Sequence, residues 1–156
     1  DRVRISVDDG GDQAIVLQPD VELRLDPPAE LHAGHDEVSA ARGADVPLTI
    51  GMDAASAGRT YLLLASASGT QPGVVFRGAA RPLKQDALTR LVFREAAAEM
   101  NPDGSGVLDI AGRPTARFRP APGALAPWIG QRIEWSAVLF KPSGHATTTA
   151  GFDVLP

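Results

Sequence analysis

Two imidazoles and one carboxylate stand close together near the first third of the chain. His32, His35 and Asp36 are residue types that zinc accepts as ligands. Gly34 lies between the two histidines, and their spacing is not that of a helical pair with both rings on one face. The third histidine, His145, is distant in sequence. We therefore expect a polar loop here, with zinc binding as the alternative.

Oxygen-bearing side chains alternate along a second segment. Asn101, Asp103 and Ser105 resemble a fragment of a calcium-binding loop. The EF-hand pattern needs more acids and a closing glutamate, and none follows at the required place. We therefore expect a plain turn. The three aspartates at positions 8–12 could also collect a cation, but such a group more often forms a solvated turn that blunts a sheet edge.

Groups for hydrolysis or sugar binding are few. No Gly-x-Ser-x-Gly elbow is present, and Gly104-Ser105-Gly106 lacks that spacing. Glu134 is the most suggestive acid for glycoside hydrolysis, because it stands beside Trp135. Neighbouring strand residues face opposite sides, so we expect Glu134 to be the exposed neighbour of a core tryptophan. Trp128 and Trp135 could stack on a sugar, but we expect Trp128 to plug a proline-rich corner.

The sequence therefore assigns no catalytic, cofactor-binding or metal-binding residue, and we expect no cofactor. The net charge is -4, and no run of Lys and Arg could displace the counterions of a nucleic acid. Cysteine is absent, which excludes disulfides and thiolate chemistry. The longest apolar run, Tyr61–Ala67, falls far short of the ~18 residues that span a bilayer.

Glycine and proline set the fold class. The chain has 16 Gly and 13 Pro, which argues against a helical bundle. These residues fall mostly between short apolar runs, a spacing typical of an all-β sandwich. Period-two alternation or a continuous apolar run predicts nine or ten strands, at 3–7, 14–17, 21–25, 46–50, 61–65, 74–76, 107–111, 115–119, 133–140 and 147–155. Residues 32–43 are expected to form a loop with one edge strand. Pro47 indicates that its strand either lies at an edge or begins there.

One stretch is ambiguous between helix and strand. Asp86 could cap a helix, and the apolar residues from Leu88 to Ala96 follow helical spacing. A lone helix in an all-β protein needs a sheet face to cover. We therefore predict a strand over 88–94, followed by a short helical turn near Glu95–Met100.

The order of three segments resembles a known family. The segments are Ala57-Gly-Arg-Thr-Tyr-Leu-Leu-Leu-Ala-Ser-Ala-Ser-Gly-Thr-Gln-Pro-Gly73, Arg81-Pro-Leu-Lys-Gln-Asp86 and Gly106-Val-Leu-Asp-Ile-Ala-Gly112. They are similar to a β-sandwich module common at the C-terminal ends of large secreted and cell-surface bacterial proteins, with the patterns AG..YLLL.S.SGT.PG, PL..D and G.LD..G.A. The likeness covers about residues 21–155. It implies an Ig-like antiparallel β-sandwich, secreted or at the cell surface, and offers no catalytic residues to carry over.

The likeness also divides the chain and suggests its function. We expect an N-terminal arm or linker with short strands at 1–20 and the β-sandwich domain at 21–156. The leading expectation is a non-catalytic extracellular structural or binding module of a bacterial surface or secreted protein. Its partners would be proteins or its own subunits through sheet edges, or a glycan, without nucleic acid or a membrane span. One alternative is a self-assembling subunit of an extracellular fibre or shell, in which the arm adds a strand to a neighbour. Another is a secreted hydrolase.

Overall fold

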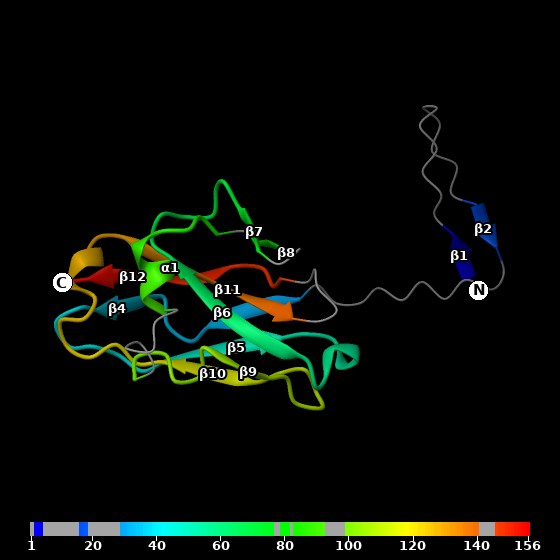
Figure 1. The fold of residues 1–156 in the computed structure, drawn as a ribbon, viewed down its shortest axis with the longest axis horizontal. Coiled ribbons are helices and arrows are strands. Elements are labelled where there is room, and N and C mark those ends of the chain that lie inside the picture. The colour runs from blue at the N-terminus through cyan, green and yellow to red at the C-terminus, as the bar shows by residue number, and fades with distance from the viewer. Residues whose placement is uncertain are drawn as a thin grey trace.

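The described residues are mostly β-structure, with two main β-sheets, two separate pairs of short strands and one short α-helix (Figure 1). A computed structural model describes residues 2–4, 16–18, 29–76, 79–81, 83–92, 99–140 and 146–156. One sheet has three strands and the other has five, and apolar side chains fill the space between them. The expected all-β sandwich-like fold is therefore confirmed.

The three-stranded sheet has the order β10-β5-β3 and is antiparallel throughout. Its strands are β3 (Glu30–Ala33), β5 (Val46–Gly51) and β10 (Thr115–Phe118). Alternate residues of β5 are fully buried, namely Val46, Leu48 and Ile50. β5 lies between β10 and β3, so the prediction that Pro47 marks an edge strand is wrong. The alternative, that Pro47 marks the start of a strand, is confirmed, because β5 begins at Val46. Gly34 donates its N–H to the Pro47 carbonyl at 2.8 Å, and a Cβ at Gly34 would collide with the Pro47 ring.

The five-stranded sheet has the order β4-β12-β11-β6-β9. Its strands are β4 (Glu37–Ser39), β6 (Thr60–Ser66), β9 (Ser105–Val107), β11 (Arg132–Phe140) and β12 (Ala150–Leu155). β4 runs parallel to β12, and the other pairs are antiparallel. The segment 32–43 therefore contributes to two strands, not one, and they belong to different sheets.

The core is centred on an aromatic contact between the sheets. The Phe118 ring lies 4.8 Å from the Trp135 ring and 6.0 Å from the Phe152 ring, measured between centroids. The alternation expected of a strand at 133–140 is confirmed where its side chains are described. Ile133, Trp135, Ala137 and Leu139 enter this core. Val138 faces the opposite side, in a second cluster with Leu64 and Leu83.

The ambiguous stretch forms a helix. α1 (Ala87–Val92) replaces the predicted strand over the described part of 88–94, so that prediction is wrong. The Asp86 carboxylate accepts the Thr89 N–H at 2.9 Å, which caps the first turn. Within the helix, the Leu88 side chain is fully buried, and the Thr89 hydroxyl donates to the Ala65 carbonyl of β6 at 2.7 Å. β6 is thus the sheet face that the helix covers. Of the predicted helical turn, Glu99 and Met100 lie in a turn, and 95–98 lie outside the described residues.

Shorter elements complete the structure. They are the antiparallel pair β7 (Val74–Phe76) and β8 (Ala79–Arg81), and the 3-10 turns η1 (Ala54–Ser56) and η3 (Ala126–Trp128). β1 (Arg2–Arg4) and β2 (Val16–Gln18) form an antiparallel pair of their own. The described residues thus form twelve strands, against nine or ten expected. The strand predicted at 21–25, and the parts of 3–7 and 14–17 beyond β1 and β2, lie outside the described residues.

Candidate functional site

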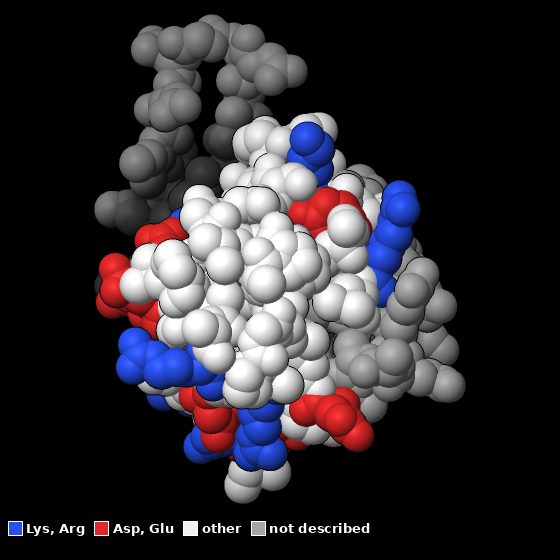
Figure 2. All heavy atoms as spheres, turned by 90° about the vertical axis from the view of Figure 1, so that its left-hand side faces the viewer, with Lys and Arg blue, Asp and Glu red and all other residues white. Residues whose placement is uncertain are grey.

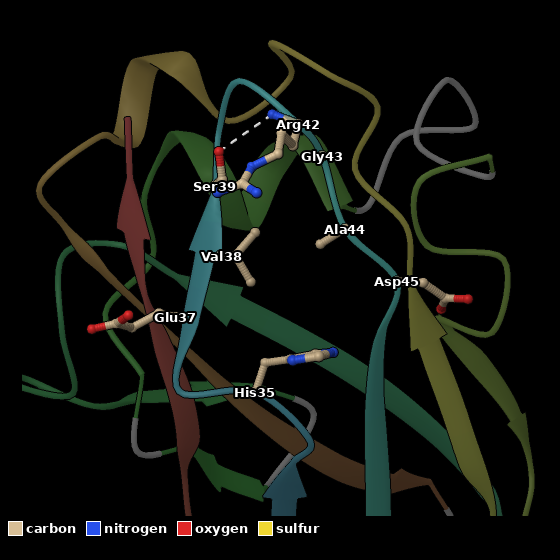
Figure 3. Close-up of a pocket in the computed structure, with 8 residues that line it drawn as sticks. All are labelled: His35, Glu37, Val38, Ser39, Arg42, Gly43, Ala44 and Asp45. Carbon is tan, nitrogen blue, oxygen red and sulfur yellow. Dashed lines mark hydrogen bonds between the residues drawn. The ribbon is translucent and has the colours of Figure 1, made fainter.

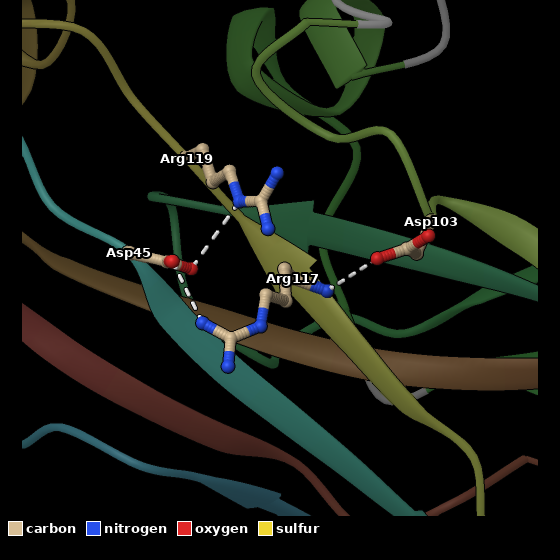
Figure 4. Close-up of polar contacts among 4 residues, drawn as sticks. All are labelled: Asp45, Asp103, Arg117 and Arg119. Carbon is tan, nitrogen blue, oxygen red and sulfur yellow. Dashed lines mark hydrogen bonds and ion pairs between the residues drawn. The ribbon is translucent and has the colours of Figure 1, made fainter.

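The outer edge of β10 is closed by a neighbouring loop. The Arg117 N–H donates to Asp103 Oδ2 at 3.0 Å (Figure 4), and the Arg119 N–H donates to the Met100 carbonyl at 2.6 Å. Tyr61 of the other sheet donates its hydroxyl to the Asp103 carbonyl at 3.3 Å. The loop therefore links the two sheets and occupies the N–H groups to which another strand could pair.

An ion pair lies on the other side of β10, towards β5 (Figure 4). Asp45 lies 2.7 Å from Arg117 Nη1 and 3.5 Å from Arg119 Nε (Figure 4). The hydrogen bond from Arg117 is the main reason that the pKa of Asp45 is lowered. All three side chains are exposed, so this contact orders the surface more than it stabilises the fold.

The outer edge of β3 is also occupied. Leu31 donates its N–H to the Thr148 hydroxyl at 3.4 Å, and Thr148 donates its own N–H to the Ala29 carbonyl at 2.9 Å. The segment before β12 thus lies along β3. Both outer edges of the three-stranded sheet therefore have partners inside the chain.

The outer edge of β9 differs from these two. Leu63 donates to the Gly104 carbonyl at 2.7 Å, and Leu108 donates to the Arg59 carbonyl at 2.9 Å. Antiparallel pairing alternates bonded and open residues, so Gly106 faces β6 and the N–H and C=O groups of residues 105 and 107 face outward. Within the described part of the chain, no hydrogen bond to these four outward groups is found.

Two large apolar side chains accompany this open edge. Val107 is 60% exposed and Ile110, three residues further on, is 93% exposed. Asp109 Oδ1 accepts the N–H groups of Ala111 and Arg113, both at 2.9 Å, which holds the turn that presents Ile110. An open edge with apolar flanks is a surface to which an extended segment can add by backbone hydrogen bonding.

A second exposed surface covers one end of the sandwich. Residues 120–131 contain no charged residue, and they lie at the end where η3 and the C-terminal residues meet. Figure 2 shows a broad uncharged area there, with charged side chains gathered around its rim. Ile129 is 44% exposed and Leu155 is 41% exposed. Trp128 is half-buried and packs against the core, as expected for a plug of this proline-rich corner.

The fourth sheet edge, β4, borders a pocket of about 310 Å³ (Figure 3). The pocket lies between β4 and the segment that leads into β5. His35 and Arg42 are among the residues that line it. A polar pocket beside a sheet edge is a candidate site for a small ligand.

The residues of the predicted zinc alternative are spread over two elements. His32 is exposed on β3 and lies 3.1 Å from Glu30 through Nε2, while His35 lines the pocket beside β4. The Asp36 carbonyl accepts the Asp153 N–H at 2.8 Å. Among the described residues, no group of three or more His, Asp or Glu side chains is arranged to hold a metal ion. His145 and the aspartates at 8–12 lie outside those residues.

The residues of the calcium-like segment lie in different surroundings. Asp103 bonds to β10 as described, Ser105 begins β9, and Asn101 is 6% exposed. The Asn101 amide has no hydrogen-bond partner, and a Cβ at Gly104 would collide with it. The expected turn is confirmed at residues 102–104, with Ser105 already in the strand. Asp103 links the two sheets, because its carboxylate accepts the Arg117 N–H of β10 and its backbone carbonyl accepts the Tyr61 hydroxyl of β6.

The acid beside the core tryptophan is also engaged. Trp135 is fully buried, so it offers no face to a sugar. Glu134 lies on the opposite face, where Oε1 accepts Arg132 Nε at 2.8 Å. Its side chain is 18% exposed, less than we expected, because Arg132 and Gly151 lie against it.

One further carboxylate organises the helix. Asp86 Oδ2 accepts the N–H groups of Ala67 and Ser68, both at 2.8 Å, and the Ser66 hydroxyl at 3.1 Å. Burial by itself would raise the pKa of Asp86, but the hydrogen bonds from Thr89, Ser68, Ala67 and Ser66 outweigh it and lower the pKa. Asp86 therefore acts as a structural clamp.

Sequence reasoning missed the open edge at β9. A short strand was expected at 107–111, but β9 covers Ser105–Val107 and residues 110–111 lie in a turn, so the prediction is wrong beyond Val107. Alternation also cannot tell an edge strand from a central strand. Turn-forming residues stand on both sides of this short apolar segment, and this composition was the available signal for a short strand at the edge of a sheet.

No protein-family model matches the chain, and no curated protein sequence matches it significantly. Within the described residues, no helix has the length and apolar character needed to cross a membrane.

Proposed function

We propose that this protein is a non-catalytic extracellular structural or binding module of a bacterial surface or secreted protein. The open outer edge of β9, flanked by Val107 and Ile110, is the observation that carries the proposal. Both edges of the three-stranded sheet have partners, so an edge without one is the natural place for another chain to add. The resemblance to modules of secreted and cell-surface proteins supports the location.

The proposed class is an Ig-like sandwich. The chain passes from β3 in one sheet to β4 in the other, and β4 pairs in parallel with the last strand. The remaining strand pairs of both sheets are antiparallel, as they are in immunoglobulin-type domains. In such domains the scaffold leaves ligand choice to loops and edges, which fits a module that binds through its surface.

A peptide-display selection tests the binding proposal. Short random peptides are selected against the protein, against an edge variant with Val107→Lys and Ile110→Lys, and against a control with Ile129→Lys and Leu155→Lys. Each variant converts two exposed apolar side chains to lysine, so the two are matched in charge and number. We expect peptides that bind the protein and the control, and that do not bind the edge variant.

Hydrogen exchange then locates the contact. The amides of residues 105 and 107 should exchange quickly in the free protein and slowly when a selected peptide is bound. If no peptide is enriched, or if the edge variant binds as well as the control does, β9 is not the binding surface.

The second candidate is a self-assembling subunit of an extracellular fibre or shell, joined by its N-terminal arm. The favouring observation is that β1 and β2, among the described strands, pair only with each other. A two-stranded hairpin is marginally stable in water, so addition to a neighbour's β9 edge would stabilise it. Residues 1–20 would be the arm and residues 21–156 the sandwich.

Light scattering with size-exclusion chromatography tests the assembly. We expect oligomers that grow with protein concentration and that disappear when residues 1–18 are deleted. A monomer at every concentration would exclude this candidate, and persistent oligomers after the deletion would exclude the arm as the joint.

A further inference from the structure

The pocket beside β4 has two rigid walls. One wall is β4, and the other is the segment 42–45 that leads into β5 (Figure 3). Gly43 donates to the Ser39 carbonyl at 3.0 Å, and Ala44 donates to the Pro120 carbonyl at 3.1 Å. Gly43 has φ +71°, and a Cβ there would lie 2.5 Å from the Pro120 carbonyl oxygen. The pocket is therefore already formed in the free protein.

The pocket lining includes the Arg42 guanidinium, the His35 imidazole and two acidic residues, Glu37 and Asp45. Figure 3 shows the Arg42 guanidinium above Val38 and the His35 ring at the other end. Among the described residues, no carboxylate lies within ion-pair distance of Arg42. Glu37 points away from the pocket, and Asp45 is held by the two arginines of β10. Neither carboxylate therefore neutralises Arg42, and its guanidinium is placed to bind an anion that enters the pocket.

The backbone of β4 adds hydrogen-bond donors. Asp153 donates to the Asp36 carbonyl, and Ala40 donates to the Leu155 carbonyl, each at 2.8 Å. These two bonds face β12, and alternation along the strand turns the N–H and C=O groups of residues 37 and 39 to the pocket side, where the Ser39 carbonyl already accepts the Gly43 N–H. Backbone N–H groups beside a guanidinium are a suitable environment for a carboxylate.

The floor of the pocket is apolar. Val38 is 3% exposed, and Ala44 is half-buried against the core. A ligand that places an anionic group on Arg42 would therefore lay an apolar body on these two side chains. We propose that the pocket binds a small organic carboxylate with an apolar body. This proposal does not depend on the β9 edge.

NMR titration with benzoate tests the proposal, and benzamide is the neutral control of the same shape. We expect benzoate to shift the amides of residues 37–45 in a saturable manner and benzamide to shift them little. Arg42→Gln should weaken benzoate binding at least about tenfold, because a charge-assisted hydrogen bond is lost. Ala44→Leu should block the pocket while it leaves the charge in place.

Arg113→Gln is the matched control. It also removes an exposed arginine charge, but it lies beyond the other end of β5, where Gly112 approaches Asp53. N-acetylphenylalanine, which carries the carboxylate of a peptide end, is titrated in parallel. Tighter binding of this compound than of benzoate would identify a peptide C-terminus as the source of the carboxylate.

Three results would overturn the proposal. Benzamide could bind as well as benzoate, Arg42→Gln could leave benzoate binding unchanged, or the shifts could fall outside residues 37–45. The melting temperature of each variant verifies that it is folded, and all three substituted side chains lie outside the fully buried core.

Discussion

The edges of β10 and β9 lie on either side of one short loop. The outer N–H groups of β10 have hydrogen-bond partners, and among the described residues the outward groups of β9 have none. Residues 100–103 cover β10 by accepting the N–H groups of Arg117 and Arg119. The chain then enters β9, whose outward groups have no partner among the described residues. The same loop thus closes one edge with a carboxylate and a carbonyl and leaves its own strand open.

The difference shows that edge protection here depends on specific acceptors. β10 and β9 are both short strands, so length does not separate them. The Asp103 carboxylate can reach Arg117 because the turn at Gly104 brings the loop beneath β10. An edge that lacks such an acceptor stays available for another chain.

The largest predicted effect concerns the carboxylate that clamps α1, as Asp103 clamps β10. Asp86→Ala should lower the free energy of unfolding by about 2–3 kcal/mol, since a helix cap and several backbone N–H partners are lost together. Urea denaturation measures this loss. Asp109→Ala is the control, because that carboxylate only holds an exposed turn after β9 and should cost about 1 kcal/mol or less.

The pH dependence of the same clamp has a defined sign. Because hydrogen bonds lower the pKa of Asp86 in the folded state, its stabilisation is complete above the unfolded pKa of about 3.9 and is lost as the pH falls through the folded pKa. Asp86→Asn should therefore give a flatter stability profile below about pH 4. An identical acid profile in the variant would show that Asp86 is not the group responsible.

The second prediction compares the two edges directly by proline substitution. Arg117→Pro removes the N–H that bonds to Asp103 and should cost about 2 kcal/mol. Val107→Pro removes an outward N–H without a described partner and should change stability by only about 0.5 kcal/mol. Equal losses in thermal or urea unfolding would show that the β9 edge is not open.

The third prediction is a coupling between Asp103 and Arg117. Asp103→Ala and Arg117→Pro remove the same hydrogen bond, so the double variant should be more stable than the sum of the single losses by about 1 kcal/mol. A double-mutant cycle measures this term. If the two single losses of stability simply add up in the double variant, other contacts hold the loop at β10.

The smallest predicted effect is at the exposed ion pair on β10. The hydrogen bond from Arg117 lowers the pKa of Asp45. An NMR titration of the Asp45 carboxyl should therefore give a pKa below the ordinary value of 3.8. Arg117→Gln should move it back towards that value. Because the Asp45 side chain is exposed, Asp45→Asn should leave the melting temperature nearly unchanged. A large drop would show that this pair contributes to the stability of the fold.

Much of the fold could be predicted, because alternation is visible in the sequence. Tyr61–Ala65 was expected to be a buried central strand, and β6 lies between β11 and β9. The helix at α1 was missed because its apolar spacing also fits a strand. The helix is fixed by hydrogen bonds from Asp86 to Ala67 and from Thr89 to Ala65. These join residues about twenty positions apart, so the local sequence does not show them.

The candidate sites were much less predictable. Asn101, Asp103 and Ser105 were considered as a group because they alternate, yet only the position of β10 gives Asp103 its partner. The pocket brings together Arg42 and His35, which the sequence did not relate to each other. Residue type therefore indicated which groups can do chemistry, but not which groups meet.

The sequence alone determined the all-β class, the acidic surface, and the buried faces of β5 and β11. These follow from composition and from the two-residue period of side chains along a strand, which are local properties of the chain. The tertiary structure decided which edges are closed, as when Leu31 meets Thr148 across 117 positions. Hydrogen bonds that close an edge need an acceptor at the right place in space, and strand pairing, not sequence spacing, sets that place.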